Sequence, residues 1–160
     1  MTTQAATRPP AATTVQVYQV LIRATPQQIW DAITKPEFTS RYFHGALVST
    51  TGEAGTPFRY YAPDGVTLWG DETILESDPP RRLVVPWRSL YDEEMAQEPP
   101  SRVTWEIEDQ GNGVCLLTAT HDQLDASPKT AQSVSGIGWL TVVSGLKTLL
   151  ETGEPLFATA

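Results

Sequence analysis

The segment from Lys129 to Thr152 is predicted to form one long amphipathic helix, and this helix constrains the fold more than any other stretch. Its apolar residues recur at helical spacing and cover a broad face: Val134, Ile137, Leu140, Val143, Leu146, Leu149 and Leu150. Gly153 provides a stop at the C-terminal end. Because a helix with so wide an apolar face has to bury it, the rest of the chain must supply a second apolar surface.

Most of the chain before this helix has the pattern of antiparallel strands joined by tight turns. Strands are predicted over residues 15–24, 42–49, 56–62, 66–77, 82–88, 102–109 and 114–122. Turn signals that favour hairpins separate several of them: Glu53-Ala54-Gly55, Asp64-Gly65 and Gly111-Asn112-Gly113. At Asp78-Pro79-Pro80 two prolines force a further turn, because proline fixes φ and cannot donate to a strand ladder.

Two short helices are predicted between the first and second strands. Thr25 is a good N-cap and Pro26 suits the first helical position, so a helix is expected over Pro26–Thr34. Lys35-Pro36 breaks this helix, and another helical turn is expected over residues 37–40. Together the elements predict an α+β fold in which a curved antiparallel sheet of about six or seven strands wraps around the long C-terminal helix.

The length of 160 residues fits a single domain. Residues 1–14 consist mainly of Thr, Ala and Pro and are predicted to be a disordered tail, because they cannot bury enough apolar surface to become ordered. The folded domain is therefore expected over residues 15–154. The single Cys115 excludes an internal disulfide and a cysteine-based zinc site, and it favours a reducing compartment, so a cytoplasmic location is predicted.

The charge of the chain argues against two classes of partner. The net charge is −8 and only three lysines occur, whereas phosphate binding needs clustered Lys and Arg, so no nucleic acid is expected as a partner. An acidic surface also disfavours anionic membranes. No apolar run approaches the ~20 residues that a membrane span needs. Neither nucleic acid nor a membrane is therefore a predicted partner.

Glycines within the C-terminal helix are the first indication of a cavity. Gly136, Gly138 and Gly145 each cost about 1 kcal/mol relative to Ala in a helix interior, so something has to offset that cost. Either another backbone comes close at these positions, or the missing side chains leave room for a ligand. Both explanations stay open for Gly145, and Gly136 and Gly138 also suit a frayed or kinked first turn.

Aromatic residues are the second indication of a cavity. Five tryptophans lie on five different predicted elements, so their indoles converge if these elements surround one interior. They are either ordinary core residues or the lining of a pocket for an apolar ligand. For Trp30 the core interpretation is favoured, because its helix is expected to pack outside the wrapped sheet and so away from such a pocket. The face that Trp69 occupies is not settled by its register. The candidate ligand-binding residues are Phe43, Phe58, Tyr60, Trp69, Trp87, Trp105, Leu117, His121, Trp139 and Val143.

Residues that could carry chemistry are few. His121 ends an alternating strand and is expected near the mouth of the cavity, either as a polar handle or general base or simply satisfied by Asp122 or a backbone carbonyl. His44 could stand at the entrance or be an exposed loop residue. The acids Asp71, Glu72 and Glu76 favour a protected sheet edge over a carboxylate pair. No catalytic, metal or cofactor motif is found, so no catalytic residue, metal or cofactor is predicted.

Four segments in this order resemble a known family: ATPQQIWDAI, DPPRRLVVPW, SRVTWEIEDQGNG with THDQL, and GWLTVVSGLKTLL. The chain resembles the START-like or SRPBCC superfamily, also called helix-grip or Bet v-like, and within it the homologues of the activator of Hsp-90 ATPase. The resemblance implies the helix-grip fold and a small hydrophobic ligand held between the C-terminal helix and the sheet. Some relatives are cyclases, aromatases or hydrolases, but no catalytic residue carries over to this chain.

The leading hypothesis is a protein that binds a small hydrophobic or aromatic molecule. One alternative is an enzyme of the polyketide cyclase or hydrolase type that uses a pocket histidine, His121 or His44. Another is a co-chaperone-like interaction module that uses the acidic surface. Apolar residues expected at the surface, among them Leu90, Tyr91 and Leu156-Phe157, also suggest a homodimer.

Overall fold

The computed structural model describes residues 15–157, and the predicted tail, residues 1–14, lies outside them. The strands are β1 (Gln16–Ile22), β2 (Leu47–Thr50), β3 (Pro57–Tyr61), β4 (Leu68–Thr73), β5 (Glu76–Asp78), β6 (Arg82–Trp87), β7 (Ser101–Gly111) and β8 (Val114–Asp122). The helices are α1 (Pro26–Thr34), α2 (Pro36–Tyr42), α3 (Pro128–Val134) and α4 (Ile137–Thr152), with a short 3-10 turn, η1 (Met95–Gln97).

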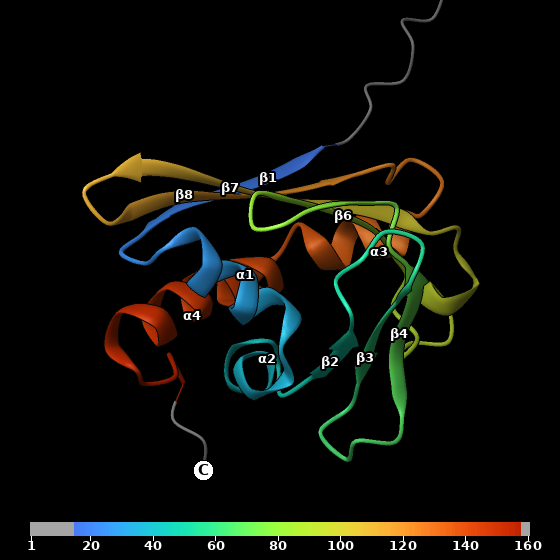
Figure 1. Ribbon diagram of the computed structural model, residues 1–160. Coiled ribbons are helices and arrows are strands. Elements are labelled where there is room, and N and C mark those ends of the chain that lie inside the picture. The colour runs from blue at the N-terminus through green and yellow to red at the C-terminus, as the bar shows by residue number, and fades with distance from the viewer. Residues whose placement is uncertain (1–14, 158–160) are drawn as a thin grey trace, which may run out of the picture.

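The strands form two antiparallel sheets, and the helices lie together on one face of the larger one. The larger sheet has the order β1-β8-β7-β6-β5 and the smaller has the order β2-β3-β4. Figure 1 shows the larger sheet as one layer, the helices beneath it, and the smaller sheet standing beside the helices. The predicted α+β class, with antiparallel strands packed around a long C-terminal helix, is confirmed. The division into two sheets was not predicted.

The two sheets arise because the predicted strand over residues 66–77 changes partners halfway. Its first part, β4, pairs with β3, and its last part, β5, pairs with β6. At the changeover the backbone N–H of Ile74 donates to Thr56 at 3.0 Å, and that of Leu75 donates to Val84 at 2.9 Å. The chain therefore passes from one sheet to the other without leaving backbone groups unpaired at this point.

The predicted strand over residues 42–49 is wrong in its first half. The helix α2 continues to Tyr42, and the chain then turns through His44 and Gly45, whose φ angles are 53° and 77°. Two successive left-handed residues cannot belong to a strand, and β2 starts only at Leu47.

The predicted C-terminal helix consists of two helices, α3 and α4, which are bent by 43° relative to each other. The break lies at Gly136, whose extended backbone (φ −94°, ψ −159°) precedes the first turn of α4. Gly136 therefore marks a kink at the start of the long helix, which was one of the explanations predicted for Gly136 and Gly138. The prediction of a continuous helix from Lys129 is wrong at this point.

Trp30 is a core residue, as predicted, although its helix was expected to pack outside the wrapped sheet. Its side chain is buried in the main hydrophobic cluster, and α1 contacts β7 as well as α2. The helix itself spans Pro26–Thr34 as predicted, with Thr25 accepting a hydrogen bond from the backbone N–H of Gln28.

The C-terminal half of α4 is held against the edge strand β1. The ammonium group of Lys147 donates to the carbonyl of Leu21 at 2.7 Å, and the carboxylate of Glu151 accepts from the backbone N–H of Arg23 at 2.9 Å. Lys147 and Glu151 also pair with each other at 2.8 Å. Edge strands expose unpaired backbone groups, and here side chains of α4 cover two of them.

Gly145 lets α4 approach α2 closely. A Cβ atom added at Gly145 would lie 3.2 Å from the Cβ of Tyr42 and 3.5 Å from its carbonyl oxygen. Tyr42 is itself fixed, because its hydroxyl donates to the carbonyl of Ala32 at 2.7 Å. Close packing explains Gly145, and the element that comes close is helix α2, not the sheet.

We expect Gly145→Val to lower the free energy of unfolding by about 2 kcal/mol, because the added methyl groups have to displace backbone atoms of α2. The matched control is Ser144→Val, which places the same β-branched side chain at the exposed neighbouring position and should change stability by less than about 0.5 kcal/mol. Urea unfolding of both variants measures the difference. Equal stability of the two variants would contradict the proposed packing.

Candidate functional site

A cavity of about 380 Å³ lies between the first turns of α4, the smaller sheet and the end of β6. Its walls come from segments that are far apart in the sequence: the loop after α2, strands β3, β4 and β6, the loop after β6, and the α3–α4 junction. Six of the ten residues predicted to bind a ligand line it, namely Phe43, Phe58, Tyr60, Trp69, Trp87 and Trp139. More than half of the predicted residues therefore border this space, and they include its large aromatic rings.

The aromatic side chains form one connected wall. The rings of Phe43 and Tyr60 are stacked with centroids 4.8 Å apart, and Trp87 meets Trp139 edge to face at 5.4 Å. The ring of Tyr60 also contacts Trp87 at 5.8 Å. Trp69, whose facing the sequence left open, is half-buried near the rim and meets Tyr91 at 5.9 Å. Each ring is held by its neighbours, so the wall exists before any ligand arrives.

The other four predicted residues lie away from the cavity surface. Trp105, Leu117 and Val143 are at most 4% exposed and belong to the packed core, where Trp105 supports Trp139 at a centroid distance of 5.4 Å. His121 is 2% exposed and contacts Trp87 and Trp139 at 6.0 and 5.7 Å. It lies behind the aromatic wall and not at the mouth of the cavity, which corrects its predicted position.

The hydrogen bonds of His121 indicate which ring nitrogen carries the proton, and its burial indicates that the ring is neutral. The hydroxyl of Ser101 donates to the carbonyl of Trp87 at 3.1 Å, so Nε2–H of His121 is the donor to Ser101 at 2.6 Å. This leaves Nδ1 as a buried acceptor without a partner. Burial lowers the pKa of His121 to about 4, although nearby Asp122 acts in the opposite direction. The ring is therefore neutral near pH 7, and its partner is Ser101 instead of the predicted Asp122 or backbone carbonyl.

His44 lies at the rim of the cavity and is also exposed, so both of its predicted descriptions apply. Its ring meets Phe43 edge to face at 6.1 Å. The left-handed backbone at His44 is what turns the chain from α2 towards β2 and brings this side chain to the entrance.

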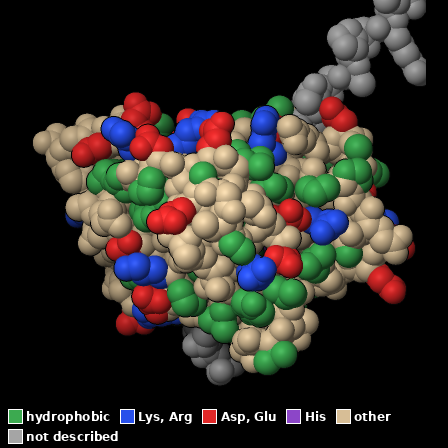
Figure 2. Space-filling model, turned by 45° about the vertical axis from the view of Figure 1, so that its right-hand side comes forward, with side chains coloured by type: hydrophobic (Ala, Val, Ile, Leu, Met, Phe, Trp, Pro, Cys, Tyr) green, Lys and Arg blue, Asp and Glu red, His purple; other side chains and the backbone are tan. Residues whose placement is uncertain are grey.

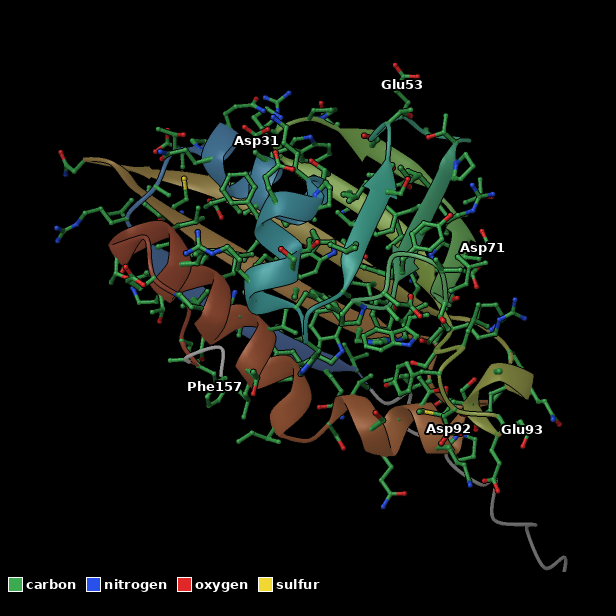
Figure 3. All side chains as sticks on the ribbon, turned by 90° about the horizontal axis from the view of Figure 1, so that it is seen from below. Asp31, Glu53, Asp71, Asp92, Glu93 and Phe157 are labelled. Atoms are coloured by element: carbon green, nitrogen blue, oxygen red, sulfur yellow. The ribbon has the colours of Figure 1, made fainter. Side chains whose placement is uncertain are left out.

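Glu72 and Arg88 form a polar spot in the otherwise apolar lining. Glu72 lies opposite Phe58 in the β3–β4 pairing, and its side chain is 17% exposed. Arg88 Nε lies 3.7 Å from Glu72 Oε1, yet both atoms are buried and neither makes a hydrogen bond. Burial raises the pKa of Glu72, partly offset by Arg88. The neighbouring Asp71 instead projects outward from β4 and pairs with Arg59 at 2.9 Å (Figure 3).

The sequence did not identify Glu72 and Arg88 as cavity residues. The acids near residue 72 favoured a protected sheet edge, and nothing in the sequence linked Arg88 to β4. The usable signal was the alternation in β3: once Phe58 faces inward, its partner in an antiparallel pair faces inward too.

The polar loop at residues 89–100 is attached to α3. The carboxylate of Glu98 accepts hydrogen bonds from the backbone N–H groups of Lys129 and Thr130, at 3.0 and 2.8 Å, and from the hydroxyl of Thr130. Glu94 pairs with Lys129. This attachment holds the loop, which contributes Tyr91 to the cavity, beside the α3–α4 junction.

Residues 15–157 contain neither a metal-binding cluster nor a single membrane-spanning helix. No group of three or more His, Cys, Asp or Glu residues there could hold a metal ion. Within the same residues no single helix has the length and apolar character to cross a bilayer, and only α3 and α4 taken together, bent by 43°, meet that requirement.

Comparison with known proteins identifies relatives of this chain. The family model described as "Activator of Hsp90 ATPase homolog 1-like protein" matches residues 23–151. Among curated protein sequences none matches significantly.

Similar solved structures share the fold at low sequence identity. CalU16 from Micromonospora echinospora is 23% identical, with a TM-score of 0.66 over 89% of this chain and 77% of that one. The Aha1 dimer from Colwellia psychrerythraea is 15% identical, with a TM-score of 0.67 over 88% and 98%. PFC0360w, an HSP90 activator from Plasmodium falciparum, is 19% identical, with a TM-score of 0.66 over 88% and 97%. These similarities support the fold alone.

The burial of neutral His121 predicts a stability that depends on pH. Its pKa is about 4 in the folded chain and 6.5 ordinarily, so the unfolded chain binds more protons between these values. Stability from this group is present above about pH 6.5 and is lost as the pH falls towards 4, by up to about 3 kcal/mol. Urea unfolding of the wild type and of His121→Leu at pH 7.5 and 4.5 measures this contribution. Both proteins have the same carboxyl groups, so the effect of these groups cancels when the two losses of stability are compared. If the wild type loses no more stability between pH 7.5 and 4.5 than His121→Leu does, the assignment of His121 as a buried neutral ring is contradicted.

Proposed function

The chain belongs to the family of Activator of Hsp90 ATPase homolog 1-like proteins, and we propose that it binds a small apolar or aromatic molecule in the cavity beside the first turns of α4. The observation that carries the proposal is the aromatic wall of Phe43, Tyr60, Trp87 and Trp139 around a space of about 380 Å³. Small-molecule sites are typically concave, mostly apolar and about 300–1,000 Å³ in size. A ligand of a few fused rings would fit such a volume.

The support behind the wall favours a preformed site. Trp105 backs Trp139, and the Ser101–His121 pair holds the backbone and ring of Trp87 from behind. Two of the four predicted residues that do not line the cavity, Trp105 and His121, therefore retain a role in the proposal, because they contact the residues that do. A preformed wall reduces the ordering that binding would otherwise require.

The enzymatic alternative keeps one of its two expected histidines, His44, and gains Glu72 in place of His121. His121 has no surface in the cavity, whereas His44 stands at the rim and Glu72 is a carboxylate whose burial raises its pKa. A carboxyl group in such surroundings is suited to acid–base chemistry on a bound ligand. Catalysis remains a prediction, secondary to binding.

The interaction-module and homodimer alternatives also remain predictions. Figure 2 shows basic side chains interspersed with acidic ones over one face of the molecule, which offers little support there for a uniformly acidic docking surface. For a homodimer, Tyr91, Leu156 and Phe157 are 56%, 42% and 66% exposed, as the hypothesis requires. The predicted cytoplasmic location is likewise a proposal.

Filling the cavity is expected to abolish binding while leaving the fold intact. A Cβ atom at Gly138, which lines the cavity, would meet only the carbonyl oxygen of Ser133, at 3.9 Å, so the chain tolerates a side chain there. We expect Gly138→Leu to weaken binding of an apolar aromatic probe such as phenanthrene at least about tenfold, which corresponds to 1.4 kcal/mol. Quenching of tryptophan fluorescence measures binding, because three of the five tryptophans line the space.

The matched control is Ser144→Leu, which adds the same side chain at an exposed position of α4 outside the cavity. This variant should bind the probe as the wild type does, and thermal unfolding checks that both variants fold. If Gly138→Leu folds and binds phenanthrene with unchanged affinity, or if the wild type binds neither phenanthrene nor lipids, polyketides and flavonoid-like aromatics, the proposed function is overturned.

A further inference from the structure

Buried polar side-chain atoms without partners gather at one place in the structure. Within residues 15–157 they are Glu72 Oε1, Trp87 Nε1, Arg88 Nε and His121 Nδ1. Three of these four residues line the cavity, and the fourth, His121, contacts two residues of its wall. Native proteins contain few such atoms, and each costs about 1–3 kcal/mol when left unsatisfied.

Elsewhere in the described part of the chain, buried polar side chains have hydrogen-bond partners. The hydroxyl of Thr39 accepts from the backbone N–H of Val48 at 3.1 Å, that of Tyr42 donates to Ala32, and that of Ser127 donates to Pro99 at 2.6 Å. Poor packing throughout the core would have scattered the unpaired atoms. Their concentration around the cavity indicates that the missing partner is a molecule that occupies it.

The geometry of Glu72 and Arg88 limits what that partner can be. Their separation of 3.7 Å exceeds hydrogen-bond length, but one oxygen atom about 2.8–3.0 Å from both can accept from Arg88 Nε–H and donate to Glu72 Oε1. Only a group that is donor and acceptor at the same atom does this; water is one such group, and on a ligand the simplest is a hydroxyl group, which takes the place of the water.

The charges around this pair favour an uncharged group. Glu72 and Arg88 offset each other, so an anion would meet the carboxylate and a cation would meet the guanidinium group at close range. Asp71 also borders the cavity, but its side chain points outward and is paired with Arg59 (Figure 3). The Glu72–Arg88 pair itself therefore leaves no net charge for an ionic ligand to neutralise.

We propose that the ligand is an uncharged hydroxylated aromatic, whose hydroxyl group bridges Glu72 Oε1 and Arg88 Nε from the cavity side while its ring lies against the aromatic wall. This inference rests on the proposed function and adds the chemical class of the ligand. The indole N–H of Trp87, also without a partner, is available to a second oxygen on the same molecule, such as a ring carbonyl.

Three probes of one size test the inference with the full chain at pH 7: 2-naphthol, naphthalene and 2-naphthoate. Tryptophan fluorescence quenching gives the affinity for each. We expect 2-naphthol to bind about tenfold more tightly than naphthalene, because hydrogen bonds to charged groups are worth more than neutral ones, and 2-naphthoate to bind more weakly than 2-naphthol.

The double variant Glu72→Met/Arg88→Met removes both polar groups together and leaves no isolated buried charge. We expect it to bind naphthalene at least as tightly as the wild type and to lose the preference for 2-naphthol. The matched control, Glu76→Met/Arg82→Met, removes an ion pair outside the cavity, 3.1 Å between its atoms, and should keep the preference. Should the double variant not fold, Glu72→Gln, which keeps the shape and loses the charge, should reduce the preference to about threefold.

The outcomes separate this inference from the proposed function. Equal affinities of the wild type for 2-naphthol and naphthalene, or tighter binding of 2-naphthoate, would overturn the hydroxyl proposal and leave an apolar binding site standing. A preference for 2-naphthol that survives in Glu72→Met/Arg88→Met would overturn it as well. Failure of the wild type to bind any of the three probes would overturn both.

Discussion

The structure depends on how α4 is held at its two ends. In its C-terminal half, Gly145 packs onto Tyr42, and Lys147 and Glu151 bind backbone groups at the end of the edge strand β1 and directly after it. In its first turns the buried ring of Trp139 meets Trp87 and Trp105, each at 5.4 Å, while Ile137 and Leu140 remain 78% and 49% exposed. A rigid rod fixed at one end keeps its other end at a set distance from the sheets. The cavity is the space that this distance leaves between Trp139, the smaller sheet and β6.

The bend at Gly136 shapes the side of the cavity next to the start of α4. Because α3 turns away by 43°, Ser133 and Val134 reach the edge of the cavity from the side instead of continuing the line of α4. Glu98 then holds the beginning of α3 through its backbone N–H groups, which connects the loop carrying Tyr91 to the same wall. The break between α3 and α4 thus leaves space beside α4, and it also places the segments that border this space, namely α3 and the loop that carries Tyr91.

Local patterns predicted much of this arrangement, and the unpredicted parts are those that depend on long-range pairing. Period-two alternation was sufficient for β7 and β8, and the Thr25-Pro26 signal was sufficient for α1. The change of partner at Ile74 and Leu75 could not be seen locally, because the alternation hardly differs between one strand and two strands in different sheets. For His121 the alternation correctly indicated an inward face, but its depth depends on Trp87 and Trp139 covering it, and these lie 34 residues before it and 18 after it in the sequence.

The Glu72–Arg88 pair distinguishes this chain's cavity from a generic apolar one. The pair is partly buried, and its facing atoms, Glu72 Oε1 and Arg88 Nε, make no hydrogen bond. An ion pair taken out of water without compensating hydrogen bonds contributes little to stability, and replacing it by apolar residues of similar size is often neutral or stabilising. Family membership explains the fold but gives no reason to place a carboxylate opposite Phe58 on the inward face of β4. If stability alone governed these two positions, apolar residues would serve better. The pair therefore suits ligand recognition better than it suits stability. Under the proposal, its two unpaired atoms gain hydrogen bonds when a polar group of the ligand bridges them.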